Sequence, residues 1–384
     1  MALDLALCLY RVTPFGGLER NCVEIALAAR RRGHRVSLFT RRFEGARPEG
    51  IEVLELPVGA WTNIGRDRAF AVAVRGALER ARPDVVVGFN KLPDLDVYYA
   101  ADPCAAATRG WPSPLALPNR RQRAAWERAL FAPGAATECL VLSECERERY
   151  REHYGTEDER LHVLPPGLRA EFLAEGPGSA PELRAELDLS REALVVLAVG
   201  SDFARKGLDR TLDALAVLPD EMRARTGLVV VGSGRPARFR SRARALGLEE
   251  RVRFTGGRAD VLDCYRAADL LVHPAREENT GSVLLEALSQ GVPVVCSSAC
   301  GFASEIERSR AGRVLDTPFD AQELARCCAE LLGDPGLRRE LGERGRAAAG
   351  SFPMERRTEI ALDVIDSVAR RKRATGAVPA PLAR

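Results

Sequence analysis

The sequence has no long apolar run and almost no net charge. A transmembrane helix needs about 20 consecutive apolar residues, and no stretch of this 384-residue chain approaches that length. The 57 Lys and Arg residues nearly balance the 54 Asp and Glu residues, and almost all of the positive charge is arginine. General nucleic-acid binding depends on a strong positive charge, so this balance argues against it.

The sequence also lacks the features of a secreted protein. The run from Met1 to Tyr10 is apolar, but it carries Asp4 and has no basic flank, so it predicts a β-strand and not a signal peptide. The 10 cysteines show no paired metal-ligand spacing and lie in apolar or helical patterns, for example at Cys8 and Cys296. Such cysteines are typical of small buried residues in a reducing compartment. We expect a cytosolic protein, held on a membrane surface at most.

The chain is long enough for two domains, each with its own core. Short β-branched runs alternate with helical patterns, which predicts two Rossmann-like α/β domains with parallel sheets. The stiff sequence Pro165-Pro166-Gly167 suits a hinge between them. We expect one domain over residues 1–166, a second over 167–352, and a final helix over 353–384 that packs back on the first domain and ends in a basic tail.

Predicted strands alternate with loops in both halves of the chain. Ser143 followed by Glu146 predicts a capping box that starts a helix after the last strand of the first half. Ligands of open parallel sheets bind at the carboxyl ends of the strands, so motifs in the loops that follow strands carry the most weight. The strands are predicted over residues 3–10, 35–40, 51–56, 84–88 and 138–142, and then over 194–199, 228–231, 252–254, 270–273 and 292–296.

The most specific motif covers residues 273–295, where a strand end, a polar loop, a helix and another strand follow one another. Thr280, Gly281 and Ser282 lie where the helix should begin. Their free backbone N–H groups and the positive end of the helix dipole would face a diphosphate. We therefore predict a phosphate site at this helix terminus.

Two glutamates of this motif are separated by seven residues. Glu286 lies about one turn inside the predicted helix, where a carboxylate can bond a ribose diol, and Glu278 lies in the loop, free to contact a sugar. A solvated surface pair is the simpler explanation for two carboxylates alone. The length of the whole pattern favours the binding site.

Two further loops agree with a diphosphate site. Arg205 and Lys206 end the loop 200–207 after a predicted strand, where two cations could neutralise a leaving diphosphate, although an ordinary surface pair is the alternative. Gly16 and Gly17 follow Phe15 before the first helix and allow a ligand to approach the backbone, although tight turns use such pairs constantly.

The segment 273–295 resembles the nucleotide-sugar signature of glycosyltransferase family 4, a group of retaining enzymes with the GT-B fold of two facing Rossmann-like domains and a cleft between them. The resemblance implies that the first domain binds the acceptor and the second the nucleotide sugar. It implies that Glu278 contacts the donor hexose and Glu286 the ribose. It also implies a phosphate clamp at Arg205 and Lys206, and a glycine loop that reaches the donor across the cleft.

The segment 88–104, together with the two loops above, is similar to the lipopolysaccharide core glucosyltransferase I (WaaG/RfaG) family over nearly the whole chain to about residue 366. This implies transfer of glucose from UDP-glucose to an inner-core heptose at the cytoplasmic face of the inner membrane. The resemblance places Asp102 near the reacting centre, and Asn90 and Lys91 near the acceptor. A turn at Asp102-Pro103 is the alternative explanation of that aspartate.

Two other patterns imitate known sites. Gly232-Ser233-Gly234 imitates a dinucleotide fingerprint, but the next strand ends without an acidic residue for a ribose, so we interpret it as a glycine turn. Asp94 and Asp96 imitate the metal-binding pair of GT-A glycosyltransferases, in the wrong fold for it. With two cations at the diphosphate, no metal or other cofactor is required.

The expected protein is a retaining hexosyltransferase with a UDP-hexose donor and a lipopolysaccharide core acceptor. The alternatives are a family 4 enzyme for another surface glycan, a nucleotide-sugar epimerase, and a silent nucleotide-sugar binding protein. The residues expected to be catalytic are Asp102, Glu278, Arg205 and Lys206, and those expected to bind the donor are Gly16, Gly17, Arg205, Lys206, Glu278, Asn279, Thr280, Gly281, Ser282 and Glu286.

A basic and aromatic segment over residues 109–131 is the expected contact with lipids of the inner membrane. We expect Trp126, Ala129 and Leu130 to share one face of a helix that starts at Asn119. A helix docked on its own domain with a solvated arginine face is the alternative. The residues in question are Arg109, Trp111, Arg120, Arg121, Arg123, Trp126, Arg128, Leu130 and Phe131.

Overall fold

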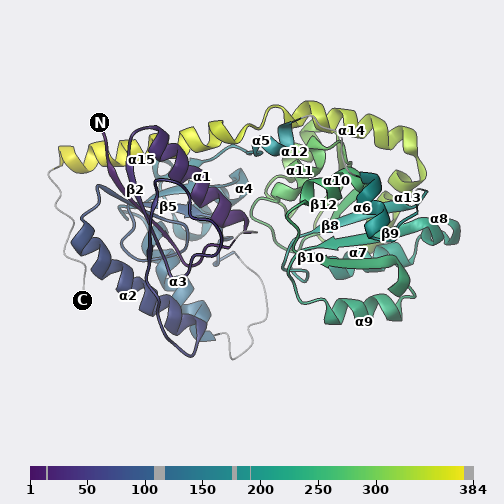
Figure 1. Ribbon diagram of the computed structural model, residues 1–384, viewed down its shortest axis with the longest axis horizontal. Helices are drawn as coiled ribbons and strands as arrows, with labels where there is room; N and C mark the ends of the chain where they lie inside the picture. Colours follow the sequence, from purple (N-terminus) through teal and green to yellow (C-terminus); the bar gives the residue numbers. More distant parts are fainter. Residues whose placement is uncertain (14–15, 108–116, 175–179, 191, 376–384) are drawn as a thin grey trace. The chain divides into compact units, whose positions relative to one another are not determined.

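The computed structural model describes residues 1–13, 16–107, 117–174, 180–190 and 192–375 (Figure 1). Two compact units divide the chain. Unit 1 consists of Met1–Pro165 with Glu355–Arg384, and unit 2 of Pro166–Met354. Each unit contains one parallel sheet with helices on both faces, which confirms the predicted class of two Rossmann-like domains.

Unit 1 holds seven parallel strands in the order β3-β2-β1-β4-β5-β6-β7. The strands are β1 Asp4–Leu9, β2 Arg35–Thr40, β3 Glu52–Glu55, β4 Val85–Gly88, β5 Val97–Ala100, β6 Glu138–Val141 and β7 Leu161–Val163. Its main helices are α1 Gly17–Arg31, α2 Asn63–Ala81, α3 Leu117–Phe131, α4 Glu144–Tyr154 and α15 Met354–Ala374, which starts one residue inside unit 2.

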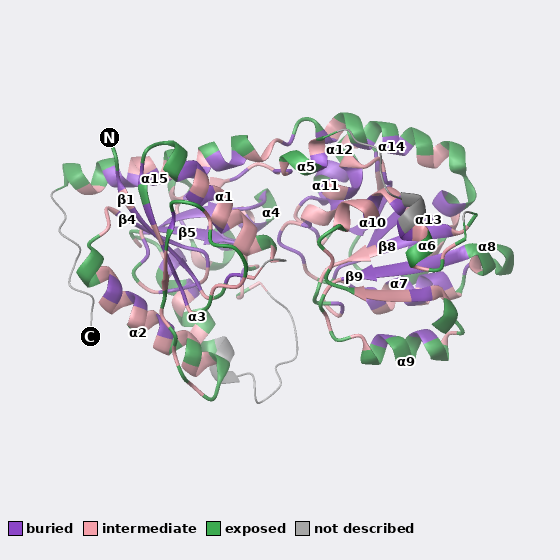
Figure 2. Cartoon of the chain, viewed as in Figure 1, coloured by how far each residue is buried: buried purple, intermediate pink, exposed green. Residues whose placement is uncertain are grey.

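Side chains of β1 alternate between two cores, because successive residues of a strand point to opposite faces of the sheet. Leu5 and Leu7 enter the core under α1 and α15, and Ala6 and Cys8 enter the core under α2, α3 and α4. Both faces are therefore covered, and the central strands β1, β4, β5 and β6 are almost entirely buried, whereas the edge strand β3 is not (Figure 2). Nine of the ten cysteines are buried and unpaired, as expected, whereas Cys145 is exposed.

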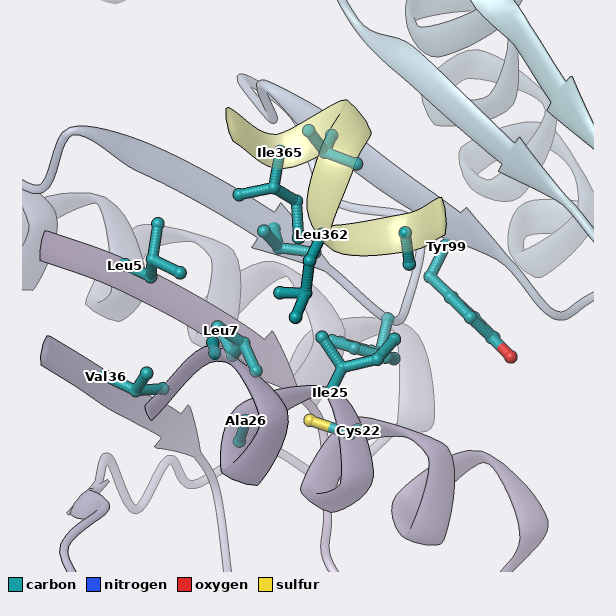
Figure 3. Close-up of a cluster of buried hydrophobic side chains, with 14 of the residues drawn as sticks. Leu5, Leu7, Cys22, Ile25, Ala26, Val36, Tyr99, Leu362 and Ile365 are labelled. Carbon is teal, nitrogen blue, oxygen red and sulfur yellow. The ribbon is translucent and has the colours of Figure 1, made fainter. Parts of the chain in front are cut away.

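The last helix, α15, completes the first core. Leu362 and Ile365 point toward Leu5 and toward α1 (Figure 3). At the other end of the helix, the segments that lead into and out of unit 2 are paired, since Leu168 N donates to Phe352 O at 2.6 Å and Met354 N donates to Leu168 O at 2.9 Å.

Unit 2 holds six parallel strands in the order β10-β9-β8-β11-β12-β13. The strands are β8 Leu194–Val199, β9 Thr226–Val231, β10 Val252–Gly256, β11 Leu270–His273, β12 Val294–Ser297 and β13 Gly312–Leu315. The helices are α5 Ala170–Leu173, α6 Ala180–Glu186, α7 Leu208–Ala216, α8 Asp220–Arg225, α9 Ala237–Ala245, α10 Val261–Ala267, α11 Ser282–Ser289, α12 Ala303–Ser309, α13 Ala321–Gly333 and α14 Pro335–Ala349.

Both sheets have a point at which the strand order reverses. In unit 2 the strand β8 lies between β9 and β11, so the loops after β8 and β11 leave the sheet side by side at its carboxyl edge. Ligands of open α/β sheets bind at this kind of position. The fold therefore brings the loop with Arg205 and Lys206 next to the loop with Glu278.

Candidate active site

The loop after β8 presents two cations. Lys206 N donates to Asp202 O at 2.9 Å and Leu208 N donates to Phe203 O at 2.9 Å, so the loop closes in tight turns before α7. Gly207 has a φ of 75°, and a Cβ at this position would collide with the carbonyl oxygen of Pro274. Glycine at this position thus permits the close approach of the β8 and β11 loops.

The loop after β11 is fixed by its backbone. Glu278 N donates to Ala299 O at 3.2 Å, and Gly301 N donates to Glu278 O at 3.1 Å. The β8 loop is attached on the other side, since Arg276 N donates to Arg205 O at 2.8 Å. These bonds hold the backbone of Glu278 between two neighbouring loops.

Three basic side chains converge on one carboxylate oxygen of Glu278. Lys206 Nζ contacts Glu278 Oε2 directly, and Arg205 Nη1 and His273 Nε2 lie 3.6 and 3.5 Å from the same oxygen. Glu278 is only 7% exposed. A carboxylate buried to this extent needs such partners, because burial of an isolated charge is costly.

Burial shapes the protonation of these partners. It lowers the pKa of Lys206 to about 7, and repulsion from Arg205 adds to this, whereas the touching Glu278 carboxylate favours the ammonium form. Burial also lowers the pKa of His273 well below its ordinary value, with further repulsion from Lys206 and Arg205. His273 is therefore neutral at physiological pH. No local sequence pattern indicated a role for this histidine, although it begins the motif.

The helix α11 begins beside this cluster. Its N-cap residue is Gly281, with a φ of 82°, and Leu284 N donates to Gly281 O at 2.9 Å. Glycine offers no side chain to cap the first backbone N–H groups, which leaves these donors to a ligand. Thr280 and Ser282 are half-buried and Asn279 is 4% exposed.

Glu286 lies on the first turns of α11 and is half-buried. Its Oε2 accepts a hydrogen bond of 2.7 Å from the hydroxyl of Tyr265. Burial raises the pKa of Tyr265 well above its ordinary value, and the neighbouring carboxylate adds to this, so the tyrosine remains a donor. Tyr265 orients the carboxylate, and no local sequence pattern pointed to it.

The glycine pair of unit 1 precedes α1. A Cβ at Gly16 would collide with the carboxylate of Glu19, whereas Gly17 has open space around it. The Glu19 carboxylate is the end of a flexible side chain that can move aside, so this contact does not make glycine obligatory at Gly16, and the space around Gly17 is open to a ligand. Phe15, which begins the motif, lies outside the described residues.

Asp102, Asn90 and Lys91 are the unit 1 residues that the resemblance places near the reacting centre and the acceptor. Asp102 follows β5 with an exposed side chain. The side chain of Asn90 accepts from Tyr10 N at 2.7 Å. Lys91, which the resemblance places near the acceptor, has a buried ammonium in contact with the carboxylate of Glu127.

Asp94 and Asp96 each form an ion pair with a basic side chain. Asp94 lies 2.9 Å from an Arg75 nitrogen, and Asp96 accepts from Lys372 Nζ at 2.7 and 2.8 Å. Within the described ranges, no group of three or more His, Cys, Asp or Glu residues is placed to hold a metal ion. The glycine turn at 232–234 packs on the β8 loop, with Ser233 N donating to Ser201 Oγ at 3.3 Å.

Part of the expected membrane segment lies outside the described residues, including Arg109, Trp111 and the side chain of Arg120. Arg121, Arg123 and Arg128 are exposed on α3. The expected apolar face is wrong, because Leu130 and Phe131 are buried in the core of unit 1 while Ala129 is exposed. No helix in the described part of the chain could span a membrane.

Comparisons with known proteins match both halves of the chain. Residues 15–172 match the family described as Glycosyltransferase Family 4, and residues 179–348 match the family described as Glycosyl transferases group 1. The chain is 38% identical to the lipopolysaccharide glucosyltransferase WaaG of Escherichia coli K12, over 94% of this chain and 98% of that protein. It is 29% identical to the D-inositol 3-phosphate glycosyltransferase of Xylanimonas cellulosilytica, over 93% of each chain.

Solved structures agree. The crystal structure of WaaG, described as a glycosyltransferase involved in lipopolysaccharide biosynthesis, matches with a TM-score of 0.88 over 94% of this chain and 99% of that one, at 38% identity. The Anabaena protein HepE, crystallised with UDP and glucose, matches with a TM-score of 0.74 over 95% of this chain and 100% of that one, at 21% identity. The second likeness concerns the fold alone.

Proposed function

The chain belongs to the glycosyltransferase family of the Escherichia coli lipopolysaccharide glucosyltransferase WaaG, and we propose that it transfers glucose from UDP-glucose to an inner-core heptose of lipopolysaccharide. It is a glycosyltransferase of the GT-B fold. The observation that carries the proposal is the convergence of Arg205 and Lys206 on Glu278 at the carboxyl edge of the second sheet. The name of the relative supports glucose and lipopolysaccharide, and UDP and the inner-core heptose are proposed from the motif resemblance.

The donor diphosphate is proposed to bind at the two cations and at the start of α11. As the bond from the anomeric carbon to the diphosphate breaks, negative charge grows on the leaving oxygens. Arg205, Lys206 and the backbone N–H groups of residues 280–282 can stabilise that charge without a metal ion. Cations at fixed positions give more stabilisation than mobile solvent, since they need no reorganisation during the reaction.

Glu278 and Lys206 must exchange partners when the donor binds. In the structure the ammonium of Lys206 contacts Glu278. A phosphate at Lys206 supplies a second anion, and the Glu278 carboxylate can then accept hydrogen bonds from hydroxyl groups of the hexose. Glu286, oriented by Tyr265, is proposed to hold the ribose diol, with Asn279, Gly16 and Gly17 as further donor contacts.

Retention of configuration is proposed from the family. A double displacement would need a carboxylate placed as a nucleophile, and the sequence motifs suggest none. We therefore propose a front-face substitution without a covalent intermediate, in which Asp102 acts at the acceptor side. The acceptor is a glycolipid, so the enzyme is proposed to work in the cytoplasm on the inner face of the inner membrane.

A screen of nucleotide sugars with core-truncated lipopolysaccharide tests this proposal. Transfer of one hexose from UDP-glucose alone supports the stated donor and acceptor. Transfer only to a different glycan would instead favour the second candidate, a family 4 enzyme for another surface glycan. The glycosyltransferase relatives argue against the epimerase and the silent binding protein.

A further inference from the structure

The loop of residues 102–105, called the Asp102 loop below, follows β5 and is attached by buried side chains of α3 and α4. We propose that Glu127 and Tyr150 are positioning residues, which hold the backbone of this loop so that the exposed carboxylate of Asp102 keeps one direction during the reaction. The inference rests on the proposed function, in which Asp102 acts at the acceptor side.

Glu127 contributes most of the contacts. It lies on α3 and is 0% exposed. Its carboxylate accepts from Ala105 N at 2.8 and 3.1 Å, and the thiol of Cys104 lies 3.8 Å from the same carboxylate. The hydroxyl of Tyr154 donates to it at 2.7 Å. One buried carboxylate thus collects donors from the Asp102 loop and from α4.

Two residues of α4 hold the other side of the loop. Cys104 N donates to the carboxylate of Glu146 at 2.8 Å, and Glu146 is 1% exposed. The Tyr150 hydroxyl donates to Asp102 O at 3.1 Å. Burial raises the pKa of Tyr150 well above its ordinary value, so this hydroxyl keeps its proton at any physiological pH.

Lys91 connects the preceding loop to the same cluster. Its ammonium contacts the carboxylate of Glu127 and lies 3.4 Å from Pro103 O. Backbone groups of all four residues of the Asp102 loop are therefore bonded to buried side chains.

The placement of these charges is informative. A buried carboxylate is costly unless it is fully hydrogen-bonded, and this fold contains two that bond the N–H groups of consecutive residues, Cys104 and Ala105. Apolar packing would fill the same space at lower cost. The side chain of Asp102, in contrast, is exposed to solvent. A carboxylate that takes part in a reaction must be held in one position, because its misplacement lowers the reaction rate. A fixed backbone beneath the exposed side chain provides this.

The clean test removes one hydroxyl. Tyr150→Phe deletes only the hydroxyl that donates to Asp102 O. It keeps the aromatic ring, whose centroid lies 3.7 Å from the ring centroid of Phe131. Tyr98→Phe is the matched control, because Tyr98 is also buried against Phe131 and its hydroxyl has no hydrogen-bond partner among the described residues. Loss of one neutral hydrogen bond predicts a kcat for the glycolipid acceptor that is about 2- to 10-fold lower in Tyr150→Phe and unchanged in Tyr98→Phe.

A double-mutant cycle separates positioning from structural support. If Tyr150 acts through Asp102, its substitution should change kcat by less than about twofold in an Asp102→Asn background, since the group it aims is then gone. UDP affinity should be unchanged in every variant. The number of UDP-binding sites in the same titration gives the concentration of folded enzyme. Equal losses of kcat in the parent and in the Asp102→Asn background would overturn the proposal, as would a kcat of Tyr150→Phe that matches the parent.

Glu127 is tested with its counter-ion. Glu127→Gln alone leaves the Lys91 ammonium buried without its anion and endangers folding, so the variant is Glu127→Gln combined with Lys91→Met. We expect this folded variant to bind UDP normally and to lose kcat. Full activity would overturn the role of Glu127. An active Asp102→Asn variant would instead refute the role of Asp102 in the proposed function, so the two failures are distinguishable.

Discussion

Lys206 and Glu278 are in direct contact through Nζ and Oε2, although the sequence motifs assign one to the diphosphate and the other to the hexose. The contact places the two groups at the same point of the sheet edge. It also means that donor binding must compensate for the ion pair that it disturbs. The two residues proposed to act on the donor are thus already in contact with each other.

Substitution of either Lys206 or Glu286 should weaken UDP binding. Lys206→Ala removes a cation from the diphosphate and Glu286→Ala removes a charged acceptor from the ribose, so each should cost about 1 to 3 kcal/mol. Titration calorimetry measures the effect, with Arg238→Ala on the exposed face of α9 as a neutral control. Unchanged UDP affinity in both variants would refute the donor-site assignment.

The depressed pKa of Lys206 predicts a pH dependence of UDP binding. Burial holds this pKa at about 7 in the free protein, so the ammonium is lost as the pH rises through that value. UDP should bind the ammonium form of Lys206 more tightly and raise the pKa of this lysine, so binding takes up protons. Above about pH 7.5 the phosphate of UDP is already ionised, and the affinity for UDP should then fall by up to about tenfold per pH unit.

Calorimetry at about pH 8 in two buffers with different heats of ionisation measures this proton uptake. Lys206→Arg is the matched variant, because a guanidinium stays charged throughout this range and should abolish the uptake. Proton uptake that is equal in the parent and in Lys206→Arg would assign the titration to another group.

Turnover should persist in excess EDTA, because Arg205, Lys206 and the start of α11 supply the positive charge at the diphosphate. The measurement is the initial rate with and without chelator. If the chelator abolishes activity and Mg²⁺ or Mn²⁺ restores it, the enzyme needs a metal ion, and Asp94 and Asp96 become candidate ligands.

The exposed arginines of α3 predict salt-sensitive binding to an anionic leaflet. Each arginine near such a surface contributes about 1 kcal/mol, so changing the exposed Arg121 and Arg123, together with Arg120 of the same predicted segment, to Gln should reduce sedimentation with phosphatidylglycerol vesicles and leave UDP binding intact. If the triple variant pellets like the parent at low salt, the contact of this segment with the leaflet is refuted.

The final helix should matter for stability. Leu362 is 1% exposed in the core of unit 1, so Leu362→Ala should lower the free energy of unfolding by about 2 to 5 kcal/mol in urea. Arg356→Ala, on the exposed side of the same helix, should change it by less than about 0.5 kcal/mol. Equal effects of the two substitutions would contradict the packing of α15.

Sequence patterns found most of the fold because the strands of a parallel sheet are continuous apolar runs. Three strands were not predicted, namely β5, β7 and β13, which have only three or four residues each. β13 carries Arg313, and β7 carries His162, which bonds Glu138 on the neighbouring strand. Their pairing is decided by the sheet around them and has no clear local pattern.

A donor site could be proposed from the sequence because its candidate residues lie in three short motifs, each in a loop that follows a strand. The support of the Asp102 loop could not be proposed in this way, since Glu127 and Glu146 meet it across 22 and 42 positions of sequence. The helical pattern around Trp126 was interpreted as a membrane face for the same reason. The burial of Leu130 and Phe131 depends on α4 and the sheet, which no pattern within α3 reveals.

Mass spectrometry of a core-truncated lipopolysaccharide incubated with UDP-glucose tests the central claim most directly. We predict that the parent enzyme adds the mass of one hexose to the glycolipid. Glu278→Gln, which keeps the shape of the side chain but removes its charge, should form little or none of this product. Consumption of UDP-glucose without any gain in glycolipid mass would contradict the account, and so would full transfer by Glu278→Gln.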